Sequence, residues 1–212
     1  MKRLNILVGI LFLLTVVYAY YQIPERLYEF TAISNTSAGL FLIAEGILSA
    51  KGKHMPRVVW QIAACSIMSV YCCTFMNAFN IVEFKFMGGY MFLHAINPII
   101  FMLFYLFTAD IRIRDTKDHI LLAAVAPVMT VVYMIFDLIR WLLTGVFIYS
   151  SLPASAPAVL IILLGTAIYA AEVAVNFLII RLKLYIAFRL KAGGEHHHFH
   201  SGQDVKHITL TP

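Results

Sequence analysis

Charged residues are scarce in this chain: only 13% of its 212 residues are Asp, Glu, Lys or Arg, whereas a soluble globular domain averages about 25%. Cysteine is nearly absent, and the three residues present, an odd number, exclude a disulfide scaffold. We find no phosphate-binding glycine loop, internal repeat, heptad run or lipidation motif. Hydrophobic residues instead make up 61% of the chain, which excludes a disordered protein and a soluble enzyme and predicts an integral membrane protein.

Six apolar stretches are long enough to cross a bilayer, which takes about 20 residues. They span about 4–22, 27–50, 58–80, 88–109, 119–145 and 157–181. The first stretch exceeds the core of a secretory signal and lacks a cleavage site, so we expect it to be a retained helix. The sequence therefore predicts an all-α, polytopic membrane protein, with a six-helix transmembrane domain at 1–191 and a flexible, His-rich cytoplasmic tail at 192–212.

Lysine and arginine are distributed unequally between the two sides of such a bundle. Of the 16 Lys and Arg residues, only Arg26 and Lys85 fall on the side opposite the termini, and Arg140 lies within the fifth stretch. Positive residues concentrate on the cytoplasmic side, so we expect both termini in the cytoplasm and the protein in the cell membrane. This asymmetry explains the net charge of +5, and we expect no nucleic-acid partner.

No cofactor or structured metal site is predicted. A haem between helices needs two intramembrane histidines, and only His94 lies within an apolar stretch at the depth required. The histidines at 196–200 could bind a divalent metal, but nothing in the sequence fixes a geometry there.

Polar side chains inside the apolar stretches are the informative ones, because each is costly in hydrocarbon unless it is paired or faces a cavity. Those of the second stretch share one helical face: Thr31, Ser34, Asn35 and Glu45. Similar stripes occur in the fourth stretch (His94, Asn97), the fifth (Tyr133, Asp137, Arg140, Thr144) and the sixth (Tyr169, Glu172, Asn176). We expect these four stripes to face one another.

Thr31, His94 and Arg140 are expected at one level of the outer leaflet, about 6, 10 and 8 Å below the ends of their helices. A hydroxyl, an imidazole and a guanidinium in one layer, with Asp137 about one turn deeper, can perform acyl transfer. Each residue also has a simpler interpretation. Asp137 could neutralise Arg140, Thr31 and Ser34 could join helices, and His94 could be a hydrogen-bonded core residue.

Three motifs, in order along the chain, carry a resemblance to a known family. Glu29–Asn35 resembles the FT-x-x-SN opening of the second span in bacterial relatives of the androgen-induced and androgen-dependent membrane hydrolases. His94–Pro98 resembles the H-x-x-x-P of their fourth span, and 133–149 is similar to the Y, R, TG and Y of their fifth. The chain departs from the animal members at Ser34, where they have an acidic or amide residue.

The resemblance implies an intramembrane lipid hydrolase with a threonine nucleophile, of the kind that cleaves fatty acid esters of hydroxy fatty acids. By position, it implies that Thr31 and His94 are the catalytic residues and that the substrate is a lipid from the bilayer. We expect His94 to take the proton of the Thr31 hydroxyl, which then attacks the ester carbonyl. Asp137 or Asn35 would orient the imidazole, and Arg140 would bind a carboxylate or the oxyanion.

The remaining polar residues leave an alternative open. In the hydrolase, we expect Ser34, Asn97, Tyr133 and Glu172 to bind the substrate or to orient the catalytic pair. The alternative is a small transporter or lipid-binding bundle with a polar path through Asp137, Arg140, Glu172 and Glu45. The chain lacks the inverted repeats and broken helices of many transporters, which favours the hydrolase.

Overall fold

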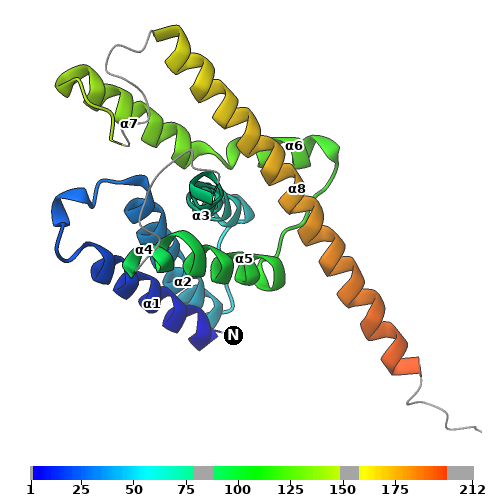
Figure 1. Ribbon diagram of the computed structural model, residues 1–212. Helices are drawn as coiled ribbons and strands as arrows, with labels where there is room; N and C mark the ends of the chain where they lie inside the picture. Colours follow the sequence, from blue (N-terminus) through cyan, green and yellow to red (C-terminus); the bar gives the residue numbers. More distant parts are fainter. Residues whose placement is uncertain (1, 79–87, 149–157, 200–212) are drawn as a thin grey trace, which may run out of the picture.

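The computed structural model describes residues 2–78, 88–148 and 158–199, with side chains at 2–72, 88–148 and 159–190. The described part is helical and contains no strand, as the sequence predicts. Its helices are α1 (Lys2–Tyr20), α2 (Phe30–Ala50), α3 (Arg57–Ala78), α4 (Gly89–Met91), α5 (Asn97–Thr108), α6 (Thr116–Val125), α7 (Val128–Thr144) and α8 (Ala158–Phe199) (Figure 1). A 3₁₀ turn, Pro24–Arg26, lies between α1 and α2, and a π-helical turn, Phe92–Ile96, joins α4 to α5.

Five helical segments of the described residues are long and apolar enough to cross a membrane. They are Lys2–Tyr20, Phe30–Ala50, Gly89–Thr108, Thr116–Thr144 and Val159–Leu190. A further apolar helix, Arg57–Cys72, is shorter. These lengths and compositions are compatible with a membrane location, whereas a count of six spans and the side of the termini stay predictions.

The fifth predicted span, 119–145, differs from the prediction because it is not one regular helix. Helix α6 ends at Val125, and α7 begins at Val128 with Pro127 as its N-cap. Proline has no N–H to donate to a preceding carbonyl, and its ring clashes with the helical turn before it. The chain changes direction between the two helices (Figure 1).

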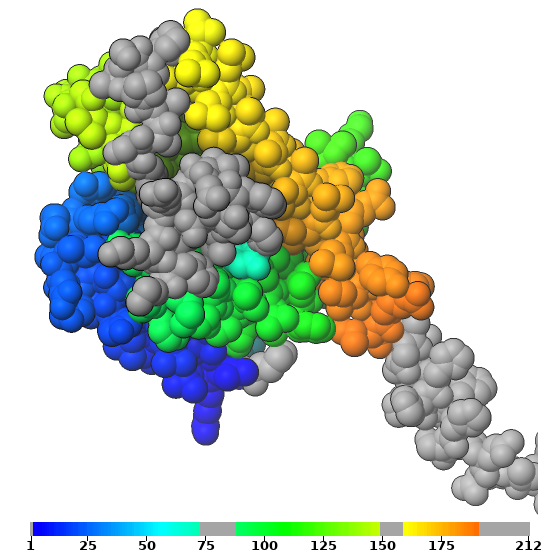
Figure 2. Space-filling view, in the orientation of Figure 1, coloured from blue at the N-terminus to red at the C-terminus, as the bar shows by residue number. Residues whose placement is uncertain are grey.

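Helix α8 lies along the outside of the molecule. Figure 2 shows it in yellow and orange across the surface, and many of its apolar side chains are exposed, Leu163 and Leu178 among them. Its backbone is helical through Phe199, so the helix continues beyond residue 191, where the sequence analysis ends the transmembrane domain. Residues 200–212 of the tail lie outside the described residues.

Glycines bring α1 and α2 into close contact. A Cβ atom at Gly9 would lie 2.5 Å from the carbonyl oxygen of Gly39, and one at Gly39 would lie 2.9 Å from that of Gly9. Small residues allow two membrane helices to approach until their backbones touch. This close contact fixes the position of α2, which carries Thr31, against α1.

An aromatic core holds α2, α3 and α5 together. The ring of Phe41 packs edge-on against Trp60 at 4.6 Å between centroids, and Phe101 lies 6.0 Å from both. All three side chains are buried. Large rings packed in this way contribute more than their area alone, so they set the spacing of the three helices around the site.

Candidate functional site

Thr31 lies in the first turn of α2, where the side chain is 3% exposed. Glu29 is the N-cap residue but makes no side-chain capping hydrogen bond, and at this end Ile33 N donates to Glu29 O at 3.1 Å. Ala32 comes before Ile33 in the chain, so the carbonyl four residues before its amide lies outside the helix. The Thr31 hydroxyl therefore lies beside the positive end of a helix of 21 residues.

His94 lies in the π-helical turn, and the sequence around it explains that turn. The amide of Asn97 donates to the Phe92 carbonyl, five residues back, which leaves the Leu93 carbonyl without its usual partner. The next residue, Pro98, has no N–H to offer. A single π-turn inside a helix is frequent at functional sites because it changes the direction of the side chains that it carries.

The structure brings Thr31 and His94 together, as their positions in the sequence predict. The Thr31 Oγ1 atom lies 3.5 Å from His94 Nε2, and both side chains are buried. On the other side of the ring, Nδ1 lies 3.4 Å from the carbonyl oxygen of Val70 in α3. A carbonyl oxygen only accepts, so we assign the ring hydrogen to Nδ1 and the lone pair to Nε2. In this tautomer the imidazole can accept the proton of the threonine hydroxyl.

Asn35 and Asn97 hold the backbones that carry the pair. Asn35 Nδ2 donates to the carbonyl of Thr31 at 2.9 Å and to the released carbonyl of Leu93 at 3.1 Å. Asn97 Nδ2 donates to Asn35 Oδ1 at 2.9 Å and to Thr15 Oγ1 of α1 at 2.8 Å. Asn35 is fully buried and Asn97 nearly so, and the network therefore fixes three chain segments relative to one another.

The group that orients the imidazole is therefore the Val70 carbonyl, and neither candidate named from the sequence does so. Asn35 bonds to backbone carbonyls beside the ring. Asp137 Oδ1 accepts from the N–H of Ile148 at 2.8 Å, which ties α7 to the chain that follows it. A carbonyl on a neighbouring helix leaves no signal in the side-chain pattern.

Arg140 lies at the N-terminal end of α2 and beside Tyr28. Its Nη2 donates to the Tyr28 hydroxyl and its Nη1 to the Val146 carbonyl, both at 3.4 Å, and its Cζ lies 4.9 Å from the Tyr28 ring centroid. The described part of the chain shows no ion pair between Arg140 and Asp137. The guanidinium thus has only long contacts to neutral groups.

Ser34 and Tyr133 also flank the pair. The Ser34 hydroxyl is fully buried, one turn after Thr31, and has no hydrogen-bond partner among the described residues. The Tyr133 ring packs on Phe30 at 5.0 Å between centroids, in a cluster that includes Val70. The polar face of α7 thus approaches the pair through Tyr133.

Glu172 belongs to a separate polar cluster, which the sequence analysis found only in part. Its Oε1 contacts the hydroxyls of Ser69 and, at 3.0 Å, Thr130. One turn along α8, Asn176 Oδ1 accepts from Gln61, whose Oε1 accepts from the Tyr105 hydroxyl at 2.5 Å. Gln61 was not singled out from the sequence, although it lies on the same face of α3 as Ser69, two helical turns before it.

Glu45 stabilises the connection between α2 and α3. Its Oε1 accepts from Ser49 Oγ at 2.9 Å and lies 2.8 Å from His54 Nδ1, while Oε2 accepts from the amide of Met55 at 2.7 Å. Both carboxylate oxygens are therefore occupied by groups of the same loop. This local role accounts for its burial without a path through the bundle.

A cluster near the 3₁₀ turn was also missed from the sequence. Buried Glu29 accepts from the Tyr20 hydroxyl at 2.8 Å and forms an ion pair with Arg26. Arg26 Nη1 also donates to the Tyr90 hydroxyl at 3.3 Å. Partial burial disfavours the charge of Arg26, yet Glu29 outweighs it and raises the pKa of the guanidinium above its ordinary value. The Tyr90 ring stacks on His94 at 6.1 Å between centroids, which connects this cluster to the pair.

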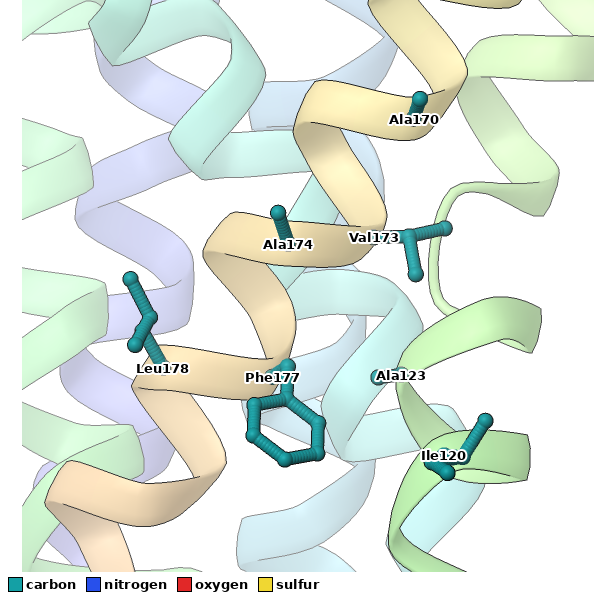
Figure 3. Close-up of a pocket in the computed structure, with 7 residues that line it drawn as sticks. All are labelled: Ile120, Ala123, Ala170, Val173, Ala174, Phe177 and Leu178. Carbon is teal, nitrogen blue, oxygen red and sulfur yellow. The ribbon is translucent and has the colours of Figure 1, made fainter.

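A cavity of about 420 Å³ lies between α6 and α8, away from the pair. Figure 3 shows its lining, which is wholly apolar and includes Ile120, Val173, Phe177 and Leu178. It shares no residue with the Thr31 and His94 environment and offers no group for acyl transfer. Within the described residues no cluster of His, Cys, Asp and Glu could hold a metal ion.

Comparison of the chain with protein-family models, curated proteins and solved structures finds no match.

Proposed function

We propose that the protein is an intramembrane lipid ester hydrolase in which Thr31 is the nucleophile and His94 the base. The observation that carries this proposal is the approach of Thr31 Oγ1 to His94 Nε2, with the Val70 carbonyl at Nδ1. A threonine hydroxyl is a poor nucleophile unless an adjacent base takes its proton. The contact of 3.5 Å is long for a hydrogen bond, but such contacts tighten when substrate binds.

The reaction proceeds in two balanced steps. Thr31 Oγ attacks the ester carbonyl, its proton passes to His94 Nε2, and the alcohol leaves with that proton, which gives an acyl-threonine. Water then loses a proton to Nε2 as its oxygen attacks the acyl carbon, and Thr31 regains the proton as the fatty acid departs. The N-terminal amides of α2 and the Ser34 hydroxyl supply donors for the negative oxygen formed in each step.

The substrate class follows from the surroundings of the pair. A buried pair between apolar helices suits a lipid whose chains remain in hydrocarbon while the ester reaches the hydroxyl. Among the described residues Arg140 has only long contacts to neutral partners, so it can bind a carboxylate by two parallel hydrogen bonds. Fatty acid esters of hydroxy fatty acids carry both groups, and the ordered motifs favour membership of the androgen-induced hydrolase family.

The proposal includes the membrane arrangement: six spans, with both termini in the cytoplasm of a cell membrane. Under this arrangement Arg26 and the beginning of α2 face the extracytoplasmic side. The lipid enters from the outer leaflet. This lipid is the only partner that the proposal requires.

The test is turnover of a fluorescent fatty acid ester of a hydroxy fatty acid by the full chain in vesicles. Thr31→Ala and His94→Ala should each lower kcat/KM by more than about a hundredfold, because each removes one half of an activated nucleophile. Thr31→Ser should retain measurable activity. Thr36→Ala, five residues along the same helix and only partly buried, is the matched control. Full activity in both alanine variants would refute the proposal.

The transporter alternative requires Asp137, Arg140, Glu172 and Glu45 to act along one path. Glu45 is occupied by its own loop, Asp137 accepts from a backbone amide, and Glu172 Oε1 accepts from hydroxyls of α3 and α7. Glu172 Oε2 is buried and has no hydrogen-bond partner among the described residues. No hydrogen bond between described residues links any two of these four side chains. These contacts favour the hydrolase.

A further inference from the structure

A second cavity, of about 300 Å³, lies between the end of α1, the turn that follows it and the beginning of α4. We call it the Tyr90 hollow, because Tyr90 forms one wall. Tyr18, Tyr21 and Gln22 contribute hydroxyl and amide groups to the rest of its lining. The hollow is therefore polar enough to hold water, unlike the apolar cavity between α6 and α8.

Tyr90 also contacts the catalytic pair. It precedes His94 by one helical turn, and the two rings stack at an interplanar angle of 25°. The same side chain thus touches the hollow and the imidazole. The ring thus lies between the hollow that it lines and the imidazole on which it stacks.

A polar latch holds the Tyr90 ring in place. The hydroxyl accepts from Arg26 at 3.3 Å, and Arg26 in turn is paired with the buried carboxylate of Glu29. Glu29 is itself anchored by the Tyr20 hydroxyl at 2.8 Å. The anchor is buried, whereas the Arg26 side chain is 47% exposed and its bond to Tyr90 is long. The weakest part of the latch is therefore the contact that holds the ring.

The backbone beneath the ring cannot move as readily. A Cβ atom at Gly89 would lie 2.5 Å from the Cα of Ala19, so α4 and α1 are already in backbone contact. Movement at this point therefore falls to the Tyr90 side chain, which can rotate about its own bonds on a timescale much shorter than turnover.

We propose that the Tyr90 hollow is the entry site for water, the acyl acceptor, and that the Tyr90 ring controls its passage to the pair. This inference rests on the proposed function and adds the route of the second substrate. With the ring closed, the lipid forms the acyl-threonine in a dry pocket. With the ring rotated, one water reaches the acyl carbon, loses its proton to His94 and releases the fatty acid.

A labelling experiment tests the route without reference to activity. Thr31→Cys places a thiol at the end of the route, and a small polar methanethiosulfonate reagent reports its accessibility in detergent micelles. Peptide mass spectrometry follows modification at position 31 separately from the natural cysteines. Adding Tyr90→Ala should raise the rate at position 31 by about tenfold, because the contacts that favour the closed ring are lost. Arg26→Gln should produce a smaller increase.

Two controls make the result decisive. Tyr185→Ala truncates an exposed tyrosine of α8 that does not line the hollow, and should leave the rate unchanged. Cys65 is buried, so its slow labelling shows that the fold of each variant is intact. If Tyr90→Ala exposes Cys65, the route is tested instead with the Arg26→Gln variant, which keeps the Tyr90 ring. Equal rates at position 31 with Cys65 protected, or the same increase from Tyr185→Ala, would overturn the route.

An activity measurement then separates this inference from the proposed function. In the Tyr90→Ala variant, glycerol should compete with water and capture acyl groups that the natural protein transfers to water alone. If labelling changes as expected but Thr31→Ala retains turnover, the route exists and the hydrolase proposal fails. If Thr31→Ala is inactive and labelling is unaffected by Tyr90, the hydrolase stands and the route is refuted.

Discussion

Replacing Asn35 with leucine should destabilise the protein by about 3–5 kcal/mol. The substitution removes two donated hydrogen bonds, to Thr31 O and Leu93 O, and one accepted from Asn97. Such bonds average about 0.6 kcal/mol each in a membrane protein. The Leu93 carbonyl would in addition remain buried without a partner, since Pro98 has no amide to offer, which costs about 1–3 kcal/mol. Leucine has a similar volume, so the loss reports hydrogen bonding rather than a cavity.

The free energy of unfolding can be measured by titration with sodium dodecyl sulfate in mixed micelles. The matched control is Asn5→Leu on the neighbouring helix, because Asn5 is also buried but its Oδ1 has no partner among the described residues. Removing an unsatisfied amide should be neutral or stabilising. The reasoning is refuted if Asn35→Leu costs no more than Asn5→Leu. A further consequence is loss of the proposed esterase activity, because the side chain that joins the backbones of Thr31 and His94 is removed.

Two other substitutions test the packing around the site. Gly39→Ala would place a Cβ 2.9 Å from the Gly9 carbonyl, and should cost about 1–3 kcal/mol in the same titration, whereas Gly165→Ala, which meets only the flexible end of Met134, should cost little. Glu45→Gln replaces the α2 carboxylate that accepts a hydrogen bond from the loop between α2 and α3 with an amide. The substitution should speed trypsin cleavage of that loop severalfold. Cleavage at an unchanged rate would show that the carboxylate does not hold the loop.

The approach of Thr31 to His94 was predictable from the sequence because depth in a membrane helix follows from residue count. Two residues at similar depth, each on the polar face of its helix, are expected to face one another inside the bundle. The same reasoning identified Asn35 and Asn97 as part of the site. Helical periodicity placed all four of these residues on the polar faces of their helices.

Other parts of the site could not be read from the sequence, and the reason is the same in each case. The Val70 carbonyl and the released Leu93 carbonyl are backbone groups, which every residue has and no pattern marks. Asp137 and Glu45 lie on polar faces, yet their partners are amides in adjacent loops. A side-chain pattern indicates that a buried polar group needs a hydrogen-bond partner, but it does not identify that partner.

The π-helical turn has a consequence for biogenesis. A protein that is made from its N-terminus releases the Leu93 carbonyl as soon as the turn forms, but the donor for this carbonyl, Asn35 Nδ2, lies on α2 and is itself held through Asn97 and Thr15 of α1. Maturation of the site is thus a docking event among segments already synthesised, and a nascent chain that stops before residue 98 has the amides of Asn35 and Asn97 but lacks the proline that shapes the turn.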